Sequence, residues 1–136
     1  LLMAIGAVGA MQRLIDVTVA YANEREAFGR PIGKFQAIRH HVAEMATKAE
    51  ASRAITYNAL RRFHEGQDCI RDVSMAKLLT QRAVLEIADQ SLQIHGGYGY
   101  MKEYGIERAV RDARLGPIGG GTDEVMKEII GRQMGL

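Results

Sequence analysis

Residues 34–64 constrain the fold of this chain most, because their apolar and small side chains recur in alternating steps of three and four. The positions that follow this rhythm are Phe35, Ile38, Val42, Met45, Ala49, Ser52, Thr56, Ala59 and Phe63. Such steps place side chains on one face of an α-helix, and a narrow apolar face is typical of a helix packed in a bundle. We therefore expect a long helix over these residues, ended by the Glu65-Gly66 pair.

One more long helix is expected before this one in the sequence, and another after it. The first runs from the start of the chain to about Glu26 or Ala27, where a glycine and a proline soon follow and break helical structure. The other runs from about Cys69 to His95, with Asp68 as its N-terminal cap. Its apolar stripe consists of Ala76, Leu79, Ala83, Ile87 and Ile94.

Two shorter helices complete the expected set. One extends from about Glu103 to Arg114, and the last begins at Thr122, whose hydroxyl is a good N-cap. No segment alternates apolar and polar residues for long enough to predict a sheet. The sequence thus predicts one all-α domain over residues 1–136, an antiparallel helical bundle that resembles a four-helix bundle and carries a short C-terminal helix.

Composition excludes several classes of function. The net charge of +2 is spread along the chain, which argues against an electrostatic nucleic-acid binder. Cys69 is the only cysteine, so neither an internal disulfide nor a cysteine metal site is expected, and a reducing compartment is the natural location. The histidines offer no ligand set beyond the weak pair His40 and Glu44, so no metal is expected.

The start of the chain is apolar or glycine from Leu1 to Ala10, which is far short of the ~20 residues that a membrane span requires. No basic segment precedes it, so it does not fit a signal peptide. It opens inside a helical pattern, without an initiator Met or a capping side chain. We expect the chain to be part of a longer protein, with no membrane span.

Two glycine clusters, residues 96–99 and 119–121, flank the shorter helix. Glycine suits places where the backbone needs a positive φ or comes close to a flat or anionic ligand, so we interpret the clusters as a ligand wall. The alternative is a helix C-cap and an interhelix turn. Neither cluster fits a dinucleotide loop or a P-loop, because the third glycine of the former and the lysine of the latter are missing.

Several local motifs, taken together, resemble the C-terminal helical domain of the acyl-CoA dehydrogenases in order and spacing. They are Arg25-Glu26-Ala27-Phe28-Gly29 with Ile32-Gly33 and Phe35-Gln36, Gln93 through Tyr100, Arg111-Asp112-Ala113-Arg114, Ile118 through Glu124, and Ile130-Gly131-Arg132. The resemblance covers essentially the whole chain. It implies a parent protein that also has an N-terminal helical domain and a middle β domain, both absent from this chain.

The resemblance also implies an activity, partners and a location. Such a parent carries FAD, oxidises an acyl-CoA to the 2,3-enoyl-CoA, and passes the electrons to an electron-transferring flavoprotein. It forms a homo-oligomer, a dimer or a tetramer, in the bacterial cytoplasm or the mitochondrial matrix.

The resemblance assigns FAD contacts to three segments of this chain. Arg25 and Gln36 match positions that reach the pyrophosphate and adenosine parts, and Phe28 would supply an apolar face. A backbone strip matches one that runs along the FAD of a neighbouring subunit, and it consists of Gln93, Ile94, His95, Gly96 and Gly97. The residues beside the ribityl and phosphate region are Thr122, Asp123 and Glu124. The alternative for Arg25 is a surface ion pair with Glu24 or Glu26.

The sequence departs from a common family pattern at the catalytic base. Many members have a Glu two residues before the Thr that opens the last helix, and this position is Gly120, between Gly119 and Gly121 at the expected substrate side. A minority, resembling isovaleryl-type and long-chain-type enzymes, carries the base on the first helix of this domain. In those sequences the base lies two residues before the position of Leu1, so we expect no catalytic base within this chain.

Two other functions remain open. The bundle could be a non-catalytic assembly module, which would have no reason to keep Arg25, Gln36 and the Gln93 to Gly97 strip together. It could also belong to a flavin oxidase or monooxygenase on the same fold, because a scaffold alone does not set the chemistry.

Overall fold

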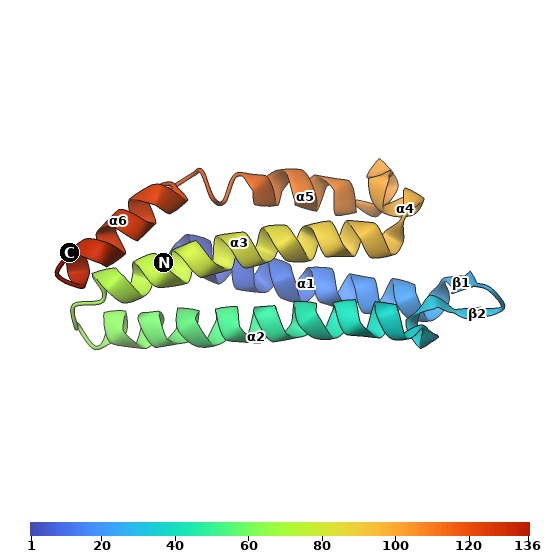
Figure 1. Ribbon diagram of the computed structural model, residues 1–136, viewed down its shortest axis with the longest axis horizontal. Helices are drawn as coiled ribbons and strands as arrows, with labels where there is room; N and C mark the ends of the chain where they lie inside the picture. Colours follow the sequence, from blue (N-terminus) through green and yellow to red (C-terminus); the bar gives the residue numbers. More distant parts are fainter.

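Three long helices run side by side in the computed structural model, which describes residues 1–136. They are α1 (Leu2–Glu24), α2 (Gln36–His64) and α3 (Ile70–His95). Consecutive helices run in opposite directions, and each packs on the other two (Figure 1). α5 (Ile106–Arg114) lies along α3, and α6 (Asp123–Gln133) packs near the start of α3. The predicted all-α antiparallel bundle is confirmed.

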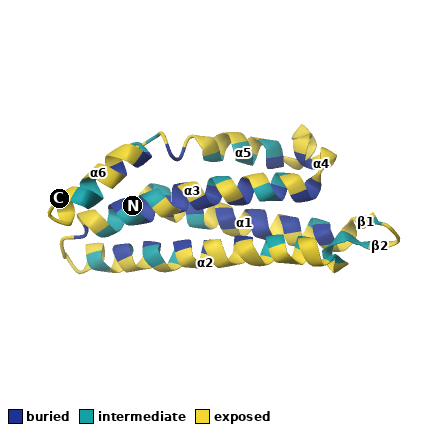
Figure 2. Ribbon diagram, in the orientation of Figure 1, coloured by how far each residue is buried: buried dark blue, intermediate teal, exposed yellow.

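The main core lies between the three long helices. Met11 from α1, Met45 from α2 and Ile87 from α3 are at most 1% exposed and belong to one apolar cluster. In Figure 2 the buried residues form a stripe on the inner face of each helix, as the spacing of three and four predicts. The middle of the α2 seam is buried, whereas Phe63 at its end is exposed.

A chain of hydrogen bonds connects polar residues of α1 and α3 inside the bundle. The Thr18 hydroxyl donates to the carbonyl of Leu14, and its oxygen lies 2.7 Å from that of Ser91. The imidazole Nδ1 of His95 lies 2.7 Å from the Ser91 carbonyl, to which it donates. Buried polar groups cost free energy unless they are hydrogen-bonded, so these contacts fix the rotation of α1 against α3 at the end near His95.

A small β-ribbon was not predicted. α1 ends at Glu24, two or three residues earlier than expected, because Arg25 adopts an extended conformation. β1 (Glu26–Ala27) then pairs antiparallel with β2 (Arg30–Pro31) across a tight turn. The turn is followed by a short 3-10 helix, η1 (Ile32–Lys34).

The segment before α5 also differs from the prediction. The short helices α4 (Gly97–Tyr100) and η2 (Lys102–Tyr104) precede it, and α5 begins at Ile106 instead of Glu103. Gly105 causes this break, because its positive φ of 70° is incompatible with a continuous helix. On α3, Leu79 was predicted to lie on the buried stripe, but it is 41% exposed and lies at the edge of the packed face.

α1 is long and apolar enough to cross a membrane when only length and composition are considered. In this fold α1 packs on both α2 and α3, and its Ala4, Met11 and Thr18 are fully buried. Packing inside the bundle therefore accounts for one face of the helix, while Leu2, Ile5 and Val17 on other faces are exposed.

The core predicts a clear contrast between two positions of α3. Ile87→Ala removes a side chain that is 0% exposed, so it should lower the free energy of unfolding by about 2–5 kcal/mol. Leu79→Ala should cost about 1 kcal/mol or less, because much of that side chain already faces solvent. Urea unfolding followed by circular dichroism measures both. Equal losses would contradict the position of the core.

Candidate functional site

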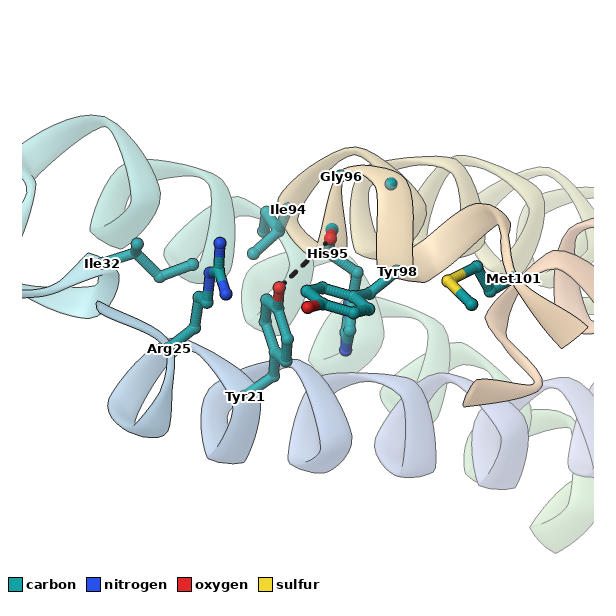
Figure 3. A pocket seen from close by; sticks show the side chains of 9 residues that line it. Tyr21, Arg25, Ile32, Ile94, His95, Gly96, Tyr98 and Met101 are labelled. Carbon is teal, nitrogen blue, oxygen red and sulfur yellow. Dashed lines mark hydrogen bonds between the residues drawn. The ribbon is translucent and has the colours of Figure 1, made fainter. Parts of the chain in front are cut away.

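A cleft of about 540 Å³ opens at the end of the bundle where α1 and α3 both finish. Of the residues predicted to contact a cofactor, Arg25, Ile94, His95, Gly96 and Gly97 line it. Figure 3 shows Arg25 and Tyr21 rising from α1 towards His95 and Tyr98 on the opposite wall. Residues seventy positions apart in the sequence therefore meet in one hollow surface.

Arg25 has a free guanidinium in this cleft. The backbone hydrogen bond from its N–H to Tyr21 closes α1, and its side chain lies 5.4 Å from the centroid of the Tyr98 ring. The ion pairs of the chain do not include Arg25, so the alternative pairing with Glu24 or Glu26 is not present. An exposed guanidinium held by a ring keeps its fork of donors available for an anionic ligand.

The histidine of the strip is a structural residue. Its ring stacks on Tyr21 with centroids 4.3 Å apart, and the Tyr21 hydroxyl donates to the His95 carbonyl at 3.2 Å. Burial raises the pKa of the Tyr21 hydroxyl, and the nearby charge of Arg25 opposes this shift. His95 is only 2% exposed, so its ring is not available to a ligand. The accessible part of the strip at this point is the backbone of Gly96 and Gly97.

The glycines of this cluster have different roles. A Cβ on Gly99 would lie 2.7 Å from the Leu92 carbonyl oxygen, so this glycine lets α4 pack on α3. A Cβ on Gly97 would meet nothing within 4 Å, and Gly97 has no positive φ. Nothing within the fold requires glycine at position 97, so its backbone is open to close approach from outside.

Phe28, at the tip of the β-ribbon, has an unusual backbone conformation. It is the only non-glycine residue with positive φ (54°), and it is 96% exposed. A bulky side chain in this region of φ carries strain, which is common at ligand clamps. Its ring approaches Phe35 edge-on at 6.1 Å. Gln36 and Gln93, also predicted contacts, are exposed at the same end of the bundle.

The second glycine cluster lies at the opposite end, next to the start of α1. Gly120 and Gly121 have positive φ values of 62° and 97°. A Cβ on Gly120 would lie 2.5 Å from the Met3 sulfur, so the first turn of α1 packs directly on this loop. Gly119 lies beside them and contacts Leu115.

The three predicted residues after this loop are placed differently from one another. Thr122 caps α6, accepting from the N–H of Val125 at 3.3 Å. The side chain of Asp123 is buried and paired with Arg82 of α3, so only its backbone can meet a ligand. Glu124 is exposed, and its own backbone N–H, then the Thr122 hydroxyl, hold the pKa of its carboxyl below the ordinary value.

The predicted site residues therefore form two groups. They are separated by the length of α1, about 35 Å for 23 residues. Tyr21 and Tyr98 were not predicted as parts of the cleft, although Tyr21 lies four residues before Arg25 and therefore on the same helical face. Nor were Lys77, Gln81 and Arg82, which contact the second group from α3.

The environment of Glu124 predicts its titration. A carboxyl whose pKa is lowered by folding stabilises the fold when ionised, and this contribution is lost as the pH falls through the folded-state pKa. In an NMR titration Glu124 should therefore titrate below the ~4.3 of an unperturbed glutamate. Thr122→Ala removes one of the two hydrogen-bond donors to the Glu124 carboxylate and should shift the midpoint upward. A midpoint at or above the ordinary value in the wild-type chain would contradict this geometry.

Comparisons with known proteins identify the family of this chain. Residues 1–135 match the family model for the C-terminal domain of acyl-CoA dehydrogenases. The mitochondrial isovaleryl-CoA dehydrogenase of Oryza sativa is 40% identical over 134 residues, which are 98% of this chain and 33% of that protein. The caffeyl-CoA reductase-Etf complex subunit CarC of Acetobacterium woodii is 42% identical over 123 residues, 90% of this chain and 32% of that protein.

A solved structure of the same fold, an FAD complex of PigA, superposes with a TM-score of 0.92 at 33% identity and covers 96% of this chain. This chain corresponds to 34% of the PigA chain and spans about a third of the length of the two relatives above. The family model and both relatives cover nearly all of the bundle. The chain belongs to the acyl-CoA dehydrogenase family, as a C-terminal domain of that family.

Proposed function

We propose that this chain is the helical domain of an FAD-dependent enzyme that oxidises an acyl-CoA to the 2,3-enoyl-CoA and delivers the electrons to an electron-transferring flavoprotein. The observation that carries the proposal is the cleft in which the free Arg25, the open backbone of Gly97 and the exposed Tyr98 ring meet. An assembly module has no use for an unpaired guanidinium beside Gly97, or for a strained Phe28. FAD, when bound, supplies the acceptor for the hydride.

The residues at the cleft fit the dinucleotide part of FAD. The fork of Arg25 suits a diphosphate, and the open backbone at Gly96 and Gly97 lets a flat ring come close. Phe28 offers an apolar face for a heteroaromatic ring. At the other end, the N-terminus of α6 with its Thr122 cap attracts phosphate oxygens.

A shared cofactor site follows from the separation of the two ends. A single ligand would have to be as long as α1 to touch both Arg25 and Thr122 of one copy. We therefore propose that the cleft of one copy and the α6 end of a second copy contact the same FAD, in a dimer or a tetramer. The resemblance of the strip from Gln93 to Gly97 to one that serves a neighbouring subunit supports this arrangement.

The proton acceptor is proposed to come from the helix that continues upstream of Leu1. A Glu two positions before Leu1 would share a helical face with Leu2 and Gly6, and a Cβ on Gly6 meets nothing within 4 Å. Met3, one turn away, already contacts Gly120, so this helix reaches the position where other family members carry the base. Glu124 is unsuited, because its lowered pKa opposes proton uptake.

A second candidate is the reverse reaction, reduction of a 2,3-enoyl-CoA. The relative CarC, a subunit of a caffeyl-CoA reductase-Etf complex, favours it. The same contacts to flavin and thioester would serve oxidation of the acyl-CoA and reduction of the enoyl-CoA. Which reaction occurs depends on whether the partner protein accepts electrons or donates them. Assays with acyl-CoA plus an electron acceptor, and with enoyl-CoA plus a reduced donor, distinguish the two.

Flavin binding should depend on Gly97. In the longer protein, Gly97→Val should lower the affinity for FAD by at least about tenfold, because a branched side chain then fills the space that the cofactor needs. The fold should be kept, since this Cβ meets no neighbour. Gly131→Val is the matched control, because a Cβ at that position also meets nothing. Full flavin content in purified Gly97→Val protein would refute the cofactor cleft.

Turnover should depend on the upstream carboxylate. Changing the Glu two positions before Leu1 to Gln should abolish turnover while FAD stays bound, because the amide cannot accept the proton. Gly120→Glu should not rescue this variant by itself, since Gly120 has a positive φ and its Cβ would lie 2.5 Å from the Met3 sulfur. Pairing it with Met3→Ala provides space. Near-normal turnover of the Gln variant would disprove this assignment of the base.

A further inference from the structure

Lys77 is a buried lysine that makes one polar contact. Its side chain lies on α3, the residue is 4% exposed, and its ammonium donates to the carbonyl of Gly121. No carboxylate of the chain forms an ion pair with it. Burial of an ammonium beside a single neutral acceptor is costly, and an apolar residue at this inward position would avoid that cost. The contact with the glycine loop therefore needs a reason other than core packing.

The contact determines how one peptide group of the loop is oriented. The Gly121 carbonyl and the Thr122 N–H belong to the same peptide, which is trans because the chain has no cis peptide bonds. In a planar trans peptide these two groups point in opposite directions. Because Lys77 draws the carbonyl towards α3, the Thr122 N–H points away from α3. That N–H donates to no backbone acceptor, whereas the next one, of Asp123, donates to Pro117 at 3.1 Å.

Two other side chains of α3, near Lys77, contact the segments around the glycine loop. Gln81 donates to the carbonyl of Met3 at 2.9 Å, and its side-chain oxygen fills the space beside Gly116. Arg82 pairs with the buried Asp123 at the start of α6. One turn of α3 thus fixes the first turn of α1, the glycine loop and the N-terminus of α6 relative to one another.

We propose that Lys77 is a positioning residue that holds the Gly121–Thr122 peptide so that the Thr122 N–H is presented to an acceptor oxygen of the bound ligand. This inference rests on the proposed function, in which the loop lies at the substrate and flavin side. The acceptor is an oxygen of the flavin or the carbonyl oxygen of the acyl thioester. Lys77 acts through the backbone and touches neither ligand.

The first test uses the 136-residue chain without any ligand. In Lys77→Met, the amide of Asp123, which closes the loop onto Pro117, should exchange with solvent about tenfold faster or more, since the loop has lost its anchor. Lys127→Met is the matched control, because it removes the same charge from an exposed position of α6. Unchanged exchange at Asp123 in a folded Lys77→Met chain would overturn the proposal.

The second test uses the longer flavin-loaded protein. If the acceptor is the thioester, Lys77→Met should lower kcat by about a hundredfold, the effect of a displacement near 1 Å, with KM and flavin content little changed. If the acceptor is on the flavin, the same variant should lose flavin while the control keeps it. A Lys77→Met enzyme that keeps both its flavin and its kcat would overturn the proposal.

A second variant and a measurement on the wild-type protein separate the role of Lys77 from a folding defect and from the proposed function. Should Lys77→Met fail to fold, Lys77→Gln takes its place, because its polar amide is shorter than the lysine side chain and cannot reach Gly121. A wild-type protein that shows the expected loop protection yet has no activity on any acyl-CoA or enoyl-CoA would contradict the proposed function, separately from the role of Lys77 in holding the loop.

Discussion

Close packing of small side chains between α1, α2 and α3 is the constraint on which the rest of the structure depends. Ala4, Ala59 and Ala76, one from each helix, are fully buried in a single cluster. Alanine at such positions lets helices approach closely along their length, and the larger Met11, Met45 and Ile87 fill the centre. The result is an elongated bundle in which one glycine cluster lies where α3 ends and the other lies between α5 and α6 (Figure 1).

Much of this fold was predictable because it follows from strong periodicity and from local capping chemistry. The spacing in α2 located its buried face, and the Thr122 cap located the start of α6. The β-ribbon was not predictable, since strands of two residues carry no period. Leu79 was predicted to be buried although it is 41% exposed, because spacing alone does not fix where the edge of the packed face lies.

The candidate site was only partly accessible to sequence analysis. The resemblance identified Arg25 and the glycine strip, and the structure brings them together in one cleft. It could not indicate that the Asp123 side chain faces Arg82, or that the His95 ring is locked under Tyr21. Those orientations depend on contacts between residues far apart in the sequence. The same is true of Lys77, whose burial contradicts every expectation for a lysine on a helix.

The central proposal is that each end of the bundle serves a different FAD in the assembly, and subunit mixing tests it most directly. A longer protein with Gly97→Val is defective only at the cleft, and one with Thr122→Pro only at the α6 end. If two copies build each site, mixed dimers of these two inactive variants contain one intact site, so co-expression should restore flavin and part of the turnover. If both ends serve the FAD of their own chain, every site in the mixture stays defective and no activity returns, which would contradict the account.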